Sequence, residues 1–124
     1  MQPNFFVITN NPLVHNKWSD SIHVELKEGS YIDVLVAARD YIYEGYTLLT
    51  HPMAGSVKPN ETPYKTVALS KEKGKLDLES VEIISSSIQT CEKFAKNPRE
   101  YPAEVLEDFR QIDYSLIKNA IDMR

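Results

Sequence analysis

The chain has 124 residues, 42% of them hydrophobic and 26% charged, which is typical of one globular domain rather than of a disordered segment. The net charge of -4 argues against a general nucleic-acid binder, which needs a basic surface to neutralise phosphates. One cysteine excludes an intrachain disulfide, and no apolar run approaches the roughly 20 residues that span a bilayer. The apolar run near the N-terminus is too short for a signal-peptide core. We therefore expect a single cytoplasmic domain over residues 1–124, without nucleic-acid or membrane partners.

The chain begins with a strand pattern, a short helix pattern and a second strand pattern. Residues 5–8 are a continuous apolar run that predicts a buried strand, and residues 22–26 alternate apolar and polar side chains. Between them, Asn11 suits a helix N-cap and Pro12 suits the first helical position, because its missing N–H has no partner there anyway. This predicts a short helix that ends near Trp18.

The middle of the chain predicts a longer helix and two further strands. Ser30 and Asp33 form a variant capping box at the start of the helix, and Gly45 provides its C-terminal stop. Residues 46–49 and 66–69 are short apolar runs that predict strands.

The last third of the chain predicts two helices. Asp77 caps the first, and Asn97-Pro98 ends it. The second begins at Pro102 and carries a wide apolar stripe of Val105, Leu106, Phe109, Ile112, Leu116, Ile117, Ala120 and Ile121. That width favours a homodimer through this helix, and the alternative is that the stripe covers one face of the sheet.

Strands that alternate with helices indicate an α/β fold with a mostly parallel sheet covered on both faces. We predict a small Rossmann-like three-layer domain with about four mostly parallel strands in the order 2-1-3-4, followed by the two C-terminal helices. In that order the loops after strands 1 and 3 meet at a switch point, where ligands collect. These loops read Thr9-Asn10-Asn11-Pro12 and Thr50-His51-Pro52, so Asn10 and His51 are expected on adjacent loops.

The segment from Thr50 to Tyr64 concentrates polar side chains on a backbone that three prolines stiffen. Long loops of this kind are often functional, and the alternative is a rigid connection whose polar groups satisfy one another. The predicted ligand-binding residues in the two loops are Thr9, Asn10, Asn11, Thr50, Gly55, Ser56, Lys58, Asn60, Glu61 and Tyr64.

These residue types favour a small anionic ligand, a phosphate or a carboxylate. Backbone N–H groups around Gly55 and Ser56 can form an anion-binding nest, and Lys58 adds positive charge. The helix start at Asn11 offers further N–H donors. The histidines and the cysteine have no metal-ligand spacing, and no nucleotide-binding motif occurs, so we expect neither a metal nor a cofactor. The alternative is a small enzyme in which His51 is a catalytic acid or base at the same pocket.

Several of these motifs resemble the GrdX family over most of the first 70 residues. They are Ile8-Thr9-Asn10-Asn11-Pro12-Leu13-Val14, Asp33-Val34-Leu35 with Arg39-Asp40, and Leu48-Leu49-Thr50-His51-Pro52 with Lys58-Pro59-Asn60-Glu61-Thr62-Pro63-Tyr64. One departure is the stretch Tyr41 to Tyr46, where the family pattern is more basic and contains histidine. The resemblance implies a small accessory protein of the glycine, sarcosine and betaine reductase systems, with a reductase-system protein as partner. It implies no catalytic residue by name.

Overall fold

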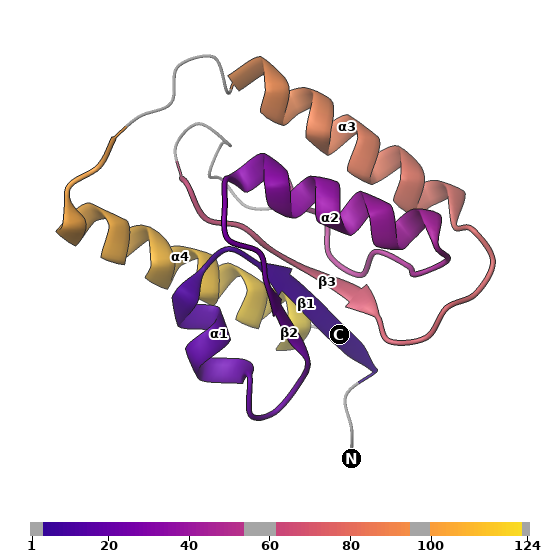
Figure 1. Ribbon diagram of the computed structural model, residues 1–124, viewed down its shortest axis with the longest axis horizontal. Coiled ribbons are helices and arrows are strands. Elements are labelled where there is room, and N and C mark those ends of the chain that lie inside the picture. Colours follow the sequence, from indigo (N-terminus) through magenta and orange to yellow (C-terminus); the bar gives the residue numbers. More distant parts are fainter. Residues whose placement is uncertain (1–3, 54–61, 95–99, 123–124) are drawn as a thin grey trace.

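A computed structural model describes residues 4–53, 62–94 and 100–122, in which a three-stranded sheet lies between two layers of helices (Figure 1). In chain order the elements are β1 (Phe5–Thr9), α1 (Pro12–Trp18), β2 (Val24–Leu26), α2 (Tyr31–Tyr43), β3 (Thr66–Ser70), α3 (Leu78–Phe94) and α4 (Ala103–Asp122). None of the described helices combines the length and the apolarity that crossing a membrane requires.

The predicted start of α1 and the predicted start and end of α2 are confirmed, and the predicted helix end at Asn97-Pro98 lies outside the described residues. The Asn11 side chain caps α1 by accepting the Leu13 N–H at 3.0 Å. Ser30 and Asp33 exchange both hydrogen bonds of a capping box at the start of α2. Gly45 follows α2 with φ +112°, a backbone conformation that only glycine adopts at low cost.

β1 is the central strand, and its alternate side chains build two separate cores. Phe6 and Ile8 pack with α2 and α3, whereas Val7 packs with Val14 of α1 and Ile117 of α4. Figure 1 shows the same division, with α2 and α3 on one side of the sheet and α1 and α4 on the other. The mixed α/β class and the helices on both faces agree with the sequence prediction.

The predicted strand order is wrong. β2 pairs with β1 in parallel, but β3 pairs with β1 antiparallel, so the described sheet has the order β2-β1-β3 and lacks the Rossmann-like topology. The predicted strand 46–49 makes one isolated bridge, between Leu48 and Leu69. The backbone N–H groups of Thr47 and Leu48 donate to side-chain hydroxyls instead of to the carbonyl groups of a strand. Ser70 accepts from Thr47, and Ser80 accepts from Leu48.

One end of the sheet nevertheless gathers the segments that carry the predicted site. Thr9 at the end of β1 pairs with Thr66 at the start of β3. Residues 47–49 run antiparallel to β3 and lead to Thr50, whose hydroxyl oxygen accepts the Ala68 N–H. Asn10 and His51 therefore follow segments that end at the same edge, but β3 lies between those segments.

The apolar stripe of α4 covers the sheet in part. Ile117 is buried in the core beside α1, whereas Ile112 is 41% exposed. The alternative of a sheet-covering helix therefore accounts for Ile117, and the homodimer stays a prediction.

Candidate functional site

A cavity of about 230 Å³ opens at this end of the sheet, between residues 49–51, the start of β3 and α4. Leu49, Thr50, His51, Lys65, Thr66, Asp113, Leu116, Ile117 and Ala120 line it. Small-molecule sites for drug-sized ligands usually enclose about 300–1,000 Å³. The cavity therefore suits a ligand of only a few non-hydrogen atoms.

Lys65 supplies a buried positive charge to this cavity. The residue is only 8% exposed, and its Nζ lies 5.9 Å from the centroid of the Tyr31 ring. Within the described residues, Nζ makes no hydrogen bond and no ion pair. Burial lowers the pKa of Lys65, and the attraction of Asp113 opposes that effect in part. A buried ammonium without hydrogen bonds is costly, so a negative ligand group beside it would stabilise the site.

Asp113 of α4 supplies the opposite charge and is 4% exposed. Its Oδ2 accepts from the Asn11 side-chain amide at 3.0 Å and from the Thr66 hydroxyl at 2.7 Å. Thr66 Oγ1 lies 2.6 Å from Thr9 Oγ1, which in turn accepts the Asn11 N–H. Because the Thr66 proton goes to Asp113, the Thr9 hydroxyl donates to Thr66. This chain of hydrogen bonds through Thr9 and Thr66 holds the Asp113 carboxyl group in place.

Burial raises the pKa of Asp113 above the ordinary value of 3.8, and it outweighs the hydrogen bonds from Asn11 and Thr66 and the attraction of Lys65. The folded protein consequently holds the Asp113 proton more tightly than the unfolded chain does. This contribution to stability is fully present below pH 3.8 and is lost as the pH rises through the folded pKa.

Asn10, predicted to bind ligand, has its side-chain groups engaged inside the protein. Its amide nitrogen donates to the Gly29 carbonyl at 3.1 Å and the Pro63 carbonyl at 2.8 Å, and its oxygen accepts the Lys65 N–H at 2.8 Å. Both amide protons and one acceptor site are therefore in use. Asn10 connects the start of β3 to the residues before α2 and so positions Lys65.

Three further predicted ligand residues also make internal contacts. Thr9 is fully buried in the hydroxyl chain described above, and Asn11 donates to Asp113 and to the Arg110 carbonyl at 2.9 Å. The Tyr64 hydroxyl accepts from Arg110 Nε at 3.1 Å, which connects the approach to β3 with α4.

Thr50 and His51 are the predicted residues that line the cavity itself. His51 is exposed, and its Nδ1 accepts the Met53 N–H at 3.1 Å. In the neutral imidazole the ring proton consequently lies on Nε2, which is a hydrogen-bond donor. This geometry presents His51 as a donor to a negative ligand group rather than as a base.

The other predicted ligand residues, Gly55, Ser56, Lys58, Asn60 and Glu61, lie outside the described residues. In the described part of the chain, no three His, Cys, Asp or Glu side chains gather as metal ligands do.

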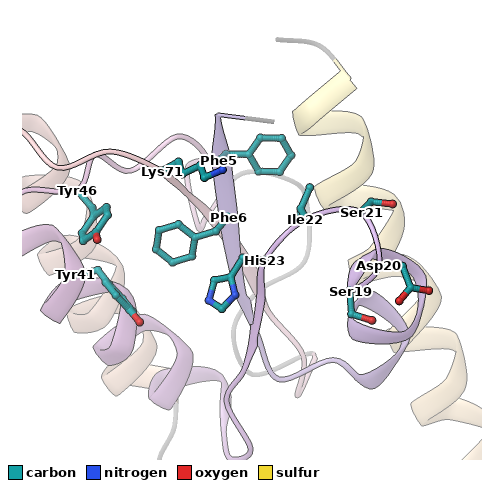
Figure 2. Close-up of a pocket in the computed structure, with 10 residues that line it drawn as sticks. All are labelled: Phe5, Phe6, Ser19, Asp20, Ser21, Ile22, His23, Tyr41, Tyr46 and Lys71. Atoms are coloured by element: carbon teal, nitrogen blue, oxygen red, sulfur yellow. The ribbon is translucent and has the colours of Figure 1, made fainter. Parts of the chain in front are cut away.

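A larger cavity, of about 490 Å³, lies at the opposite end of the sheet (Figure 2). On one side of it, the rings of Phe6, Tyr41 and Tyr46 pack edge to face with centroids 5.2–5.6 Å apart. The Tyr41 hydroxyl already donates to Glu25, and the Ser19, Asp20, Ser21, His23 and Lys71 side chains of the wall are exposed to solvent. Size alone favours this cavity, but the smaller one is lined by two buried charged residues that form no ion pair within the described part of the chain, and we take it as the candidate site.

Sequence comparison supports the resemblance. The family model described as GrdX-like protein matches residues 6–122, nearly the whole chain. The chain belongs to the GrdX-like family. Searches of curated proteins and of solved structures gave no match. The matched region includes β3 and α4, so the two charged residues of the cavity lie inside the family domain.

Lys65 and Asp113, which the structure brings together, are not among the ligand-binding residues predicted from the sequence. Lys65 directly precedes an apolar strand and looks like an ordinary flanking charge. Asp113 could have been recognised from the sequence, because it lies in the apolar row of its helix, four residues after Phe109 and four before Ile117. An acidic residue in the apolar row of a helix is expected to have a buried partner.

Proposed function

We propose that this GrdX-like protein binds a small metabolite through its anionic group, at the cavity between β3 and α4. The observation that carries the proposal is Lys65, a buried residue of the cavity wall whose ammonium group has no hydrogen-bond partner among the described residues. The Nε2–H of His51 and the hydroxyl of Thr50 are further donors at the same cavity. Such a set of donors suits a carboxylate or a phosphate.

The family resemblance implies the physiological setting. A small accessory protein of the glycine, sarcosine and betaine reductase systems could report the level of a metabolite to a partner protein of that system. We propose this role over the alternative of an acid/base enzyme, because His51 Nδ1 is already engaged by the Met53 N–H. The two roles differ in the effect of His51→Gln: an enzyme loses turnover and keeps its affinity, whereas a binding protein has no turnover to lose.

The proposal is tested by titrating the protein with sodium phosphate and sodium propionate while recording amide NMR shifts. We expect shifts at Thr50 and Thr66, which line the cavity. Lys65→Met keeps the length of the side chain and removes one charge-assisted hydrogen bond, so anion affinity should fall about 10- to 150-fold. Lys118→Met, at an exposed position of α4, removes the same charge and should leave affinity unchanged. Absence of shifts with both anions, or equal losses in the two variants, would overturn the proposal.

A further inference from the structure

The candidate cavity is lined by two opposite charges that do not form a contact pair. Lys65 and Asp113 are 8% and 4% exposed, and both line the same cavity. Both also line a second, smaller cavity next to Tyr31, so they lie near one another. No ion pair between them occurs within the described residues. Buried charges that serve only the fold are normally paired directly, because separation leaves the desolvation cost uncompensated.

Asp113 accepts hydrogen bonds from two neighbouring residues. Its Oδ2 accepts from the Asn11 amide and the Thr66 hydroxyl, and the Thr66 backbone N–H is a further donor to the carboxyl group. A carboxylate can accept about four hydrogen bonds, so Asp113 retains acceptor capacity. Within the described residues, no acceptor takes a hydrogen bond from the three N–H groups of Lys65 Nζ. The described part of the site thus presents donors on one residue and acceptor capacity on the other.

A ligand with a single charge would satisfy only one of these residues. A simple anion would pair with Lys65 and be repelled by the Asp113 carboxylate, and a simple cation would meet the reverse situation. A small molecule that carries both a carboxylate and an ammonium group would satisfy both residues. From this complementarity, and resting on the proposed function, we infer that the ligand is a small zwitterion of the α-amino-acid type. Its carboxylate faces Lys65 and its ammonium group faces the Asp113 carboxylate.

The size of the cavity agrees with this ligand class. A volume of about 230 Å³ leaves room for an amino acid with a short side chain. The apolar part of the wall, Leu116, Ile117 and Ala120 of α4, offers contacts for a few carbon atoms.

The test compares three molecules that share a carbon skeleton: alanine, propionate, which lacks the ammonium group, and ethylamine, which lacks the carboxylate. Isothermal titration at neutral pH should show alanine binding at least about 10-fold more tightly than either of the others, since each lacks one charge-assisted contact. Equal affinities of alanine and propionate would overturn the zwitterion and leave the anion site intact. Absence of binding by alanine, propionate and phosphate alike would overturn both.

A variant identifies the contact with the ammonium group. Asp113→Asn, with its amide oxygen at the Oδ2 position, preserves the bonds from the Asn11 amide and the Thr66 hydroxyl and puts an NH₂ group in place of the other oxygen. Alanine affinity should fall about 10- to 150-fold, and propionate affinity should stay the same or rise. Asp108→Asn, at an exposed position of the same helix, is the matched control and should change neither affinity. Equal losses for alanine and propionate would overturn the inference, and if Asp113→Asn does not fold, the comparison of ligands on the unmodified protein decides.

Discussion

Replacing Asn10 by alanine tests the physical basis of the site, because this side chain connects three segments. Asn10→Ala removes the bonds to the carbonyls of Gly29 and Pro63 and the bond from the Lys65 N–H, with lengths of 3.1, 2.8 and 2.8 Å. Asn10 does not itself line the cavity, so the variant changes the support of Lys65 and keeps every lining residue.

The expected loss of stability follows from the three hydrogen bonds. A typical intramolecular hydrogen bond contributes about 0.5–1.5 kcal/mol net, and a buried donor left without a partner costs about 1–3 kcal/mol. The Lys65 N–H is such a donor because its residue is buried, whereas Gly29 is exposed and water can replace Asn10 there. Together these contributions give a decrease of about 2–4 kcal/mol in the free energy of unfolding.

Urea unfolding followed by circular dichroism measures this difference. Asn16→Ala, at an exposed position of α1, is the matched control and should change stability by less than about 0.5 kcal/mol. At temperatures where Asn10→Ala remains folded, its affinity for propionate should also fall, because Lys65 loses its fixed position. If the two asparagine variants are equally stable, the reasoning that Asn10 supports the site is refuted.

Three further predictions concern other groups. Tyr41→Phe should lower the free energy of unfolding by about 1 kcal/mol, because the hydrogen bond to Glu25 is lost. The same hydrogen bond raises the pKa of Tyr41 to about 12, so Glu25→Gln should lower that pKa in an absorbance titration. Gly45→Ala should cost about 2–3 kcal/mol in urea unfolding, because φ is +112° and its Cβ would collide with the Gly74 carbonyl, whereas Gly74→Ala meets no atom. The stability of the unmodified protein relative to Asp113→Asn should fall as the pH rises from about 4 through the raised pKa of Asp113, by at most about 1.4 kcal/mol per pH unit; parallel stability curves would contradict the raised pKa.

Local structure could be predicted from the sequence because its causes are local. The N-cap at Asn11 and the capping box of Ser30 and Asp33 involve residues at most three positions apart, and a polar side chain there has few other partners. The central strand could also be predicted, since a fully apolar run must be covered on both faces. In these cases the residues that determine the local structure are close together in the sequence.

The strand order could not be obtained in that way, although one signal was available. Adjacent parallel strands need a crossover connection, which is usually a helix. The sequence between Leu49 and Thr66 contains three prolines and no helical periodicity. A direct return is the simpler path, and it makes β3 antiparallel to residues 47–49. The prediction treated every strand alike and gave too little weight to this connection.

The placement of the loops could be predicted better than the chemistry of the candidate site. The polar residues after β1 and after residues 47–49 were expected at one end of the sheet, and both segments end there. The ligand site itself stays a prediction. Which of these polar residues are free to bind depends on contacts between distant segments. Asn10 and Tyr64, for example, hydrogen-bond to residues far away in the sequence. Lys65 and Asp113 show the opposite case, since each looks ordinary in its own segment and only the packing of α4 against β3 makes the two charges neighbours. A charged residue inside an apolar helical row is therefore a more useful sign of the candidate site than the polar loop. Its burial has to be compensated by polar or charged partners, and these partners lie around the candidate cavity.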